Sequence, residues 1–311
     1  MNSPLIVLNA LVVRADSQAP EAIRHARPGY NVNRAGQGIE DGGVQDRVLA
    51  LTERPQLEWE AFDEYWRKVH GPKILHVDGA DDQQTGLLTY YLQQHRVPSG
   101  PTSERPAPYR ALTDHNGLLV TDPALRCSPY QRPQWDGMAQ LGYQSSQDLE
   151  TFFNLGPGKY GQKIVPDEAV FIRGFGFHIA EEHVVLQRGD RRRDPILMIK
   201  THVRNPELTR AQFRGYWMAQ HADLVVSGAP GAELLRRYAQ LVNISSPADK
   251  LYDPVGDRFD GVGVMSFANM NDVEDYLASA AYAAVQANEA EFARESAYFT
   301  ALNYVIRDHS A

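Results

Sequence analysis

The sequence predicts an α+β fold of two tandem ferredoxin-like units, because one aromatic motif occurs twice and because both halves follow one order of strands and helices. The motif is Phe-x-x-Tyr-Trp-x-x-x-His, at residues 62–70 and again at 213–221. Self-similarity of this kind indicates an internal duplication. With 311 residues and a hydrophobic content of 43%, each half has enough apolar material for a core.

Each motif predicts an amphipathic helix whose buried face ends in a histidine. Phe62, Trp66 and His70 are spaced four residues apart, so they share one face at helical pitch. The second copy repeats the three residue types at the same spacing. A Gly-Pro step follows His70 and is expected to interrupt or end the first helix, because proline cannot donate the next backbone hydrogen bond.

The order strand, helix, strand, strand, helix, strand is expected in each half, and this is the ferredoxin-like plan. In the first half these elements are expected at 48–51, 62–70, 87–92, 138–143, 146–150 and 169–172. In the second half, strands are expected at 196–203, 237–242, 261–267 and 301–305, and helices are expected to start at Thr209 and at about residue 271. Thr209 and Gln212 are expected to form a capping box at the start of the first of these helices.

The domain boundaries follow from the repeat. We expect an N-terminal extension at 1–45, a first domain at 46–189 and a second domain at 190–311. The extension has no counterpart in the second half, and its apolar run 5–13 is expected to add an edge strand. A Pro-rich insert at about 97–134 is either an idle surface loop or a lid, and we favour a loop that covers a pocket.

Composition excludes several classes of partner. The net charge is −8 and basic residues form no stripe, so nucleic acid is not expected. One cysteine, Cys127, allows no internal disulfide, which favours a reducing, cytoplasmic compartment. The apolar run 5–13 is too short to span a membrane, so no membrane partner is expected. Motifs for nucleotide, zinc-protease and serine-hydrolase chemistry are missing.

Taken together, the repeated motifs resemble those of the EthD-type domain family, in the dimeric α+β barrel superfamily. The resemblance covers about residues 46–180 and 194–307. It rests first on the helix motif. It rests also on tyrosines in the second strand of each half, which are Tyr90, Tyr91 and Tyr238, and on an aromatic-Asp-Gly sequence at 135–137 and 259–261.

This resemblance implies four antiparallel strands with two helices on one face in each half, and two such sheets that close into a barrel. The contact usually made between two chains can then be internal, and a homodimer is possible. Similar proteins include cofactor-free decarboxylases, dehydratases and other lyases of aromatic or polyketide metabolism. We therefore expect a cofactor-independent lyase, with an aromatic small-molecule substrate and no cofactor. The alternatives are a cofactor-free oxygenase or isomerase, and a non-catalytic accessory or haem-binding protein.

Histidine and tyrosine are the candidate catalytic residues, because an imidazole exchanges protons near neutral pH and a phenol can stabilise an oxyanion. The alternative is that these side chains serve only the core. In the strand 196–203, Met198, Lys200 and His202 share a face, whereas the aligned positions are Arg47, Leu49 and Leu51. Lys200 and His202 therefore favour the second half as the active one, and the alternative is that they line a solvated end of the barrel. The catalytic candidates are His221, His70, Tyr238, Tyr91 and His202. The candidates for substrate binding are Trp66, Trp217, Tyr65, Tyr216, Tyr90 and Lys200, and no metal site is expected.

Overall fold

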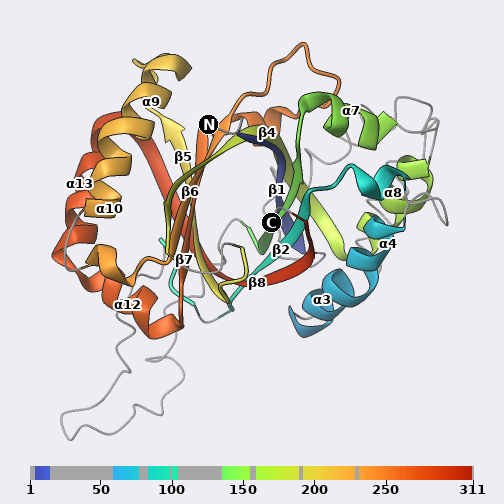
Figure 1. The fold of residues 1–311 in the computed structure, drawn as a ribbon, viewed down its shortest axis with the longest axis horizontal. Helices are drawn as coiled ribbons and strands as arrows, with labels where there is room; N and C mark the ends of the chain where they lie inside the picture. The colour runs from blue at the N-terminus through green and yellow to red at the C-terminus, as the bar shows by residue number, and fades with distance from the viewer. Residues whose placement is uncertain are drawn as a thin grey trace, which may run out of the picture.

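Eight antiparallel strands, four from each half of the chain, close into one barrel in the computed structural model (Figure 1). The structure describes residues 4–14, 59–76, 83–98, 100–103, 135–154, 159–188, 192–227 and 231–309. The strands are β1 (Leu5–Arg14), β2 (Tyr90–Arg96), β3 (Gly137–Tyr143), β4 (Ile172–Gln187), β5 (Ile196–Arg204), β6 (Arg237–Asn243), β7 (Gly261–Phe267) and β8 (Ala293–Asp308).

Strand order explains how the halves join. Around the barrel it is β1-β3-β2-β8-β5-β7-β6-β4, so each half contributes a ferredoxin-like sheet, β4-β1-β3-β2 or β8-β5-β7-β6. Two antiparallel seams, β2 with β8 and β4 with β6, connect these sheets. The expectation of two separate ferredoxin-like domains is therefore corrected to one barrel, because neither sheet keeps a free edge.

Strand β1 corrects the expectation of an N-terminal extension with an edge strand. It pairs on both sides, with β3 and β4, and most of its residues are buried, as an apolar run without polar alternation allows. Its register matches that of β5, since Val12 lies opposite Gly137 as His202 lies opposite Gly261. The counterparts of Met198, Lys200 and His202 are thus Leu8, Ala10 and Val12, whereas the run 48–51 lies outside the described residues.

Helices cover opposite sides of the barrel, one set for each half (Figure 1). The first-half set is α3 (Trp59–Tyr65), η1 (Trp66–His70), α4 (Gly71–Leu75), α5 (Gln83–Gly86), α7 (Ser146–Asn154) and α8 (Lys159–Phe171). The second-half set is α9 (Arg210–Tyr216), η3 (Trp217–His221), α10 (Ala222–Ser227), η4 (Gly231–Leu234), α12 (Met270–Ala278) and α13 (Ala280–Phe292). The short helix α11 (Pro254–Asp257) lies against β4. Residues 169–171, expected in a strand, belong to α8, and β4 starts just after them.

The motif helices contain a π-helical turn that ends at the histidine. In the first half it spans Trp66–His70, and the Gly71 N–H donates to the Trp66 carbonyl. The Gly-Pro step does not end the helix, because Pro72 lies in the first turn of α4, a position that tolerates proline. In the second half, the capping box of Thr209 and Gln212 is confirmed at the start of α9.

The same contact between sheet and helix holds the π-turn in each half. Gln93 Nε2 in β2 donates to the Trp66 carbonyl over 2.9 Å, and Gln240 Nε2 in β6 donates to the Trp217 carbonyl over 2.8 Å. Such wide turns occur often at functional sites. No helix within the described ranges is long and apolar enough to cross a membrane.

Candidate functional site

A pocket of about 490 Å³ lies in the second half, between the outer face of the barrel and α13. Lys200 reaches it from β5, and helix α13 contributes Tyr282 and Glu289. Strand β8 contributes Ser296 and Tyr298. Because side chains alternate along a strand, Lys200 and His202 face this helix layer while Leu197 and Ile199 pack inside the barrel.

Lys200 and Glu289 form a buried ion pair on the pocket wall. Their side chains are 2% and 5% exposed, and Lys200 Nζ lies 2.6 Å from Glu289 Oε2. Lys200 also donates to the Tyr282 hydroxyl over 3.1 Å. Burial lowers the pKa of Lys200 and raises the pKa of Glu289, and the attraction between the two charges opposes both shifts. Burial also raises the pKa of Tyr282, so its phenol keeps its hydrogen.

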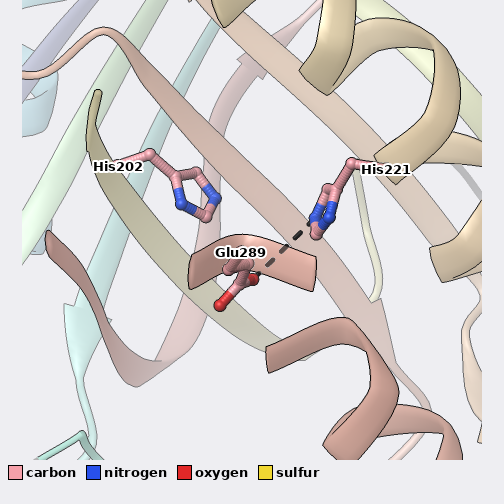
Figure 2. A group of neighbouring side chains, drawn as sticks. All are labelled: His202, His221 and Glu289. Carbon is pink, nitrogen blue, oxygen red and sulfur yellow. Dashed lines mark ion pairs between the residues drawn. The ribbon is translucent and has the colours of Figure 1, made fainter. Parts of the chain in front are cut away.

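Two histidines lie next to this pair. The rings of His202 and His221 are 6.1 Å apart between centroids, and His221 Nε2 is 3.8 Å from Glu289 Oε1 (Figure 2). His221 Nδ1 is 2.9 Å from Asn288 Oδ1, and His202 Nδ1 is 2.9 Å from Ser296 Oγ. Burial lowers the pKa of His221 to about 4, so the ring is neutral at neutral pH. Burial lowers the pKa of His202 as well, with contributions from Lys200 and His221.

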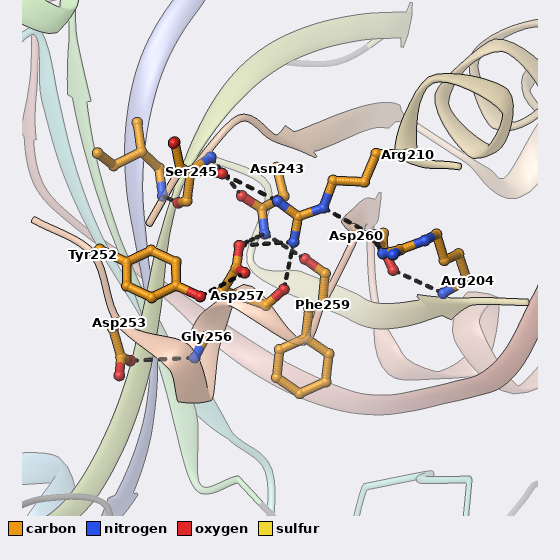
Figure 3. Close-up of polar contacts among 12 residues, drawn as sticks. Arg204, Arg210, Asn243, Ser245, Tyr252, Asp253, Gly256, Asp257, Phe259 and Asp260 are labelled. Atoms are coloured by element: carbon orange, nitrogen blue, oxygen red, sulfur yellow. Dashed lines mark hydrogen bonds and ion pairs between the residues drawn. The ribbon is translucent and has the colours of Figure 1, made fainter. Parts of the chain in front are cut away.

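Arg210, the first residue of α9, anchors the helix that carries His221. Its guanidinium donates to Asp257 Oδ1 over 2.7 Å, to Asp260 Oδ1 over 3.1 Å and to the Ser245 carbonyl over 3.1 Å (Figure 3). Asp260 also accepts from the Arg204 N–H over 2.9 Å, so one carboxylate links the start of β7 to β5 and α9. The aspartate of the aromatic-Asp-Gly motif, Asp260, thus connects the backbone of β5 to the start of helix α9.

The first half places a different set of groups around its histidine. His70 Nδ1 lies 2.7 Å from Asp167 Oδ2, the Tyr65 hydroxyl donates to Asp167 Oδ1 over 2.7 Å, and Lys73 also contacts this carboxylate. Burial raises the pKa of Asp167, but hydrogen bonds from His70, Lys73 and Tyr65 outweigh it and lower the pKa to about 2. A cavity of about 40 Å³ adjoins His70, with Trp66 and Tyr91 in its wall. That volume holds a few water molecules and no aromatic ring.

The remaining sequence candidates are buried or are held by contacts with neighbouring side chains. Tyr238 is fully buried, and its hydroxyl accepts from Gln240 Nε2 over 3.1 Å. Trp217 is also fully buried, and the Tyr216 hydroxyl accepts from Asn288 Nδ2 over 2.9 Å. Tyr90 belongs to the cluster inside the barrel and has Arg192 over its ring, so it lies on the opposite face of the sheet from Tyr91.

The start of the Pro-rich insert runs along β8 beside the second-half pocket. The Val97 N–H donates to the Thr300 carbonyl over 2.9 Å, and the Ser103 N–H donates to the Tyr298 carbonyl over 3.0 Å. Ser103 also lines the pocket. Residues 104–134, including Cys127 and most of the expected lid, lie outside the described residues.

Glu289, Tyr282, Asn288 and Asp167 were not among the sequence candidates. A signal for three of them was present, because Asp167-Glu168-Ala-Val-Phe171 recurs as Asn288-Glu289-Ala-Glu-Phe292. The two copies are equivalent in the fold, since Ile172 pairs with Arg14 as Ala293 pairs with Arg204. The repeated segment would have marked the acidic neighbour of each histidine, Asp167 for His70 and Glu289 for His221.

The fold and the pocket define an α+β barrel protein with duplicated halves and a polar, buried site in the second half. The EthD domain matches residues 54–174 and 205–296, which together make up more than half of the chain. The chain belongs to the EthD domain family.

Comparison with solved structures finds matches of low sequence identity. An anthrone oxidase-like protein is 11% identical, with a TM-score of 0.46, and the match covers 99% of this chain and 96% of that one. A mutant chlorite dismutase from Candidatus Nitrospira defluvii is 10% identical, with a TM-score of 0.43, over 98% of this chain and 94% of that one. Comparison with curated proteins finds no match.

Proposed function

We propose that this EthD-family chain is an enzyme, a lyase that acts on an aromatic or phenolic small molecule in the second-half pocket. The reaction would break a carbon–carbon bond, by decarboxylation or loss of an aldehyde, or remove water. The observation that carries the proposal is the buried Lys200–Glu289 pair on the wall of a pocket of about 490 Å³. Pockets of this size accommodate small organic ligands.

Reactions of this class need one proton removed from the substrate and one returned. Glu289 suits the first role, because burial raises its pKa and makes its carboxylate a stronger base. Lys200 and Tyr282 suit a second role, in which their hydrogens stabilise negative charge that develops on a phenolic or enolic oxygen. Burial moves the pKa of Lys200 down and the pKa of Glu289 up, toward each other.

In this proposal His221 lies beside Glu289, 3.8 Å from Nε2 to Oε1, and does not itself remove the proton. With a pKa of about 4 the ring is a weak base at neutral pH. The small cavity beside His70 supports placing the chemistry in the second half. The proposal therefore moves the acid–base role from the two motif histidines to the carboxylate and ammonium beside one of them.

Deuterium exchange tests the proton-transfer step without knowledge of the natural substrate. The full chain is incubated in D₂O with salicylate, a phenolic acid, and with phenylpyruvate, an enolisable acid, and loss of carbon-bound hydrogen is followed by proton NMR. The wild-type protein should accelerate exchange, while Glu289→Gln and Lys200→Met should each lower the rate by at least about 100-fold. Glu168→Gln, at the equivalent position of the first half, should leave the rate unchanged.

Products distinguish the reaction classes. Release of carbon dioxide, an aldehyde or water from a turned-over substrate identifies a lyase. An isomer of unchanged composition, or consumption of dioxygen, would replace the lyase by an isomerase or an oxygenase. Exchange that survives in Glu289→Gln would remove Glu289 from the reaction.

A further inference from the structure

Three potential metal ligands converge behind the pocket wall. His202 comes from β5, His221 from η3 and Glu289 from α13, and all three are buried. One nitrogen or oxygen atom from each lies within 4.8 Å of the others. Figure 2 shows the three side chains pointing toward one another.

His221 and Glu289 each have a polar atom that is available to bind a ligand. Among the described residues, His221 Nε2 and Glu289 Oε1 have no hydrogen-bond partner, although His221 is fully buried and Glu289 is 4% exposed. His221 Nδ1 faces an amide oxygen of Asn288, which can only accept, so the hydrogen of the neutral ring sits on Nδ1 and the lone pair on Nε2. Buried polar atoms of this kind normally have a partner.

The surroundings orient both rings as metal sites require. Asn288 holds His221 through Nδ1, and Ser296 holds His202 through Nδ1, each over 2.9 Å. Outer hydrogen bonds of this kind fix ring orientation in metal centres.

We propose that His202, His221 and Glu289 bind one divalent transition-metal ion, of the Zn²⁺ or Fe²⁺ class. Two imidazoles and one carboxylate form a ligand set found in both zinc and non-haem iron sites. This departs from the sequence-based expectation of no metal and no cofactor. It does not depend on the proposed reaction, because binding is measured without turnover.

Lys200 is the group that competes with such an ion. Its ammonium lies 2.6 Å from Glu289 Oε2, so it already neutralises the carboxylate. The rival explanation is that this ammonium fills the cationic position and that a water molecule bridges His221 and Glu289 across their 3.8 Å gap. Replacing Lys200 by the uncharged methionine therefore tests the competition directly.

The first half offers a matched control. His70 and Glu168 occupy the positions of His221 and Glu289, but the second histidine is replaced by Val12. His70 is also held by a carboxylate, Asp167, where His221 is held by an amide. A metal ion should therefore select the second half.

The test is a calorimetric titration of the full-length, EDTA-treated protein with Zn²⁺, together with a Co²⁺ titration followed by visible absorption. One ion should bind per chain, and Co²⁺ should give ligand-field bands. His221→Ala, His202→Ala and the near-isosteric Glu289→Gln should each weaken binding by at least about 100-fold, since each removes a direct ligand. His70→Ala should bind Zn²⁺ like the wild type, and Lys200→Met should bind it more tightly.

Three results would overturn the proposal. One is no binding to the wild type, including the case in which only Lys200→Met binds, which would show that the ammonium fills the site. Another is binding that Glu289→Gln leaves unchanged in a folded protein, checked by circular dichroism. The third is loss of binding in His70→Ala. The deuterium-exchange assay, run with and without Zn²⁺, reports on the proposed reaction separately.

Discussion

Single residues make the two halves chemically different. The outer face of β5 carries Lys200 and His202, where β1 carries Ala10 and Val12. Around the first-half histidine, aliphatic and aromatic side chains therefore leave a small apolar cavity, whereas the second half holds a polar pocket. These few differences place the candidate chemistry in one half.

Buried neutral histidines should also make the fold sensitive to acid. Burial lowers the pKa of His178 to about 4, as it does that of His221. In the unfolded chain these rings take up protons near pH 6.5. Because the unfolded state binds more protons between these values, stability is fully present above about pH 6.5 and is lost as the pH falls toward 4.

Replacing His178 tests this linkage outside the pocket. Urea unfolding at pH 7.5 and pH 5.0 should show a loss of stability for the wild type, and His178→Gln should shrink that loss by up to about 2 kcal/mol. The exposed His309→Gln is the control and should keep the wild-type loss. An equal loss in His178→Gln and the wild type would contradict the assigned protonation state.

Among the elements, each motif tryptophan packs on the glycine that starts the third strand of its half. A Cβ atom added at Gly261 would lie 2.3 Å from Trp217 Cζ3, and one added at Gly137 would lie 2.6 Å from Trp66 Cζ3. Both distances are below van der Waals contact, and the atom added at Gly137 would also lie 2.6 Å from the Gln94 carbonyl oxygen, so neither position has room for a side chain. The motif is thus explained by packing.

Gly261→Ala should destabilise the protein by about 1–3 kcal/mol, because the ring must shift within a filled core. Gly137→Ala should have an effect of the same size. Gly215→Ala, in α9, is the control, because its added Cβ meets nothing within 4 Å and alanine favours a helix. Midpoints of urea unfolding measure all three, and an unchanged midpoint in Gly261→Ala would contradict the packing.

Elements that depend on local patterning could be predicted, and those that depend on distant partners could not. The expected strands at 237–242 and 261–267 match β6 and β7, and the capping box is present. β1 was misassigned because its partners, β3 and β4, are far away in sequence. The π-turns were not predicted, since they are supported by glutamines on other strands. Glu289 could have been singled out from its repeated segment, but its link to Lys200 could not, because that link joins a late helix to an earlier strand.

For the whole molecule, the two seams should make folding a single event. Each sheet would expose two unpaired edge strands without the other, and such edges are unfavourable and prone to aggregation. Interior side chains from both halves also share one cluster, which includes Val7, Leu92, Ile199 and Phe299.

Urea unfolding should therefore give one transition, with the same midpoint by tryptophan fluorescence and by far-UV circular dichroism. Gly137→Ala and Gly261→Ala, although they lie in different halves, should each shift that single transition. Two transitions, each moved by one variant, would show that the halves unfold independently.

The covalent joining of the two halves has an evolutionary consequence. When a barrel is assembled from two identical chains, every substitution appears at both equivalent places, so neither can specialise without the other. Here β5 carries a histidine and a lysine where β1 carries valine and alanine, a difference that two identical chains could not have. In a single chain with two halves, one half can therefore serve mainly to maintain the fold while the other acquires a different set of reactive side chains.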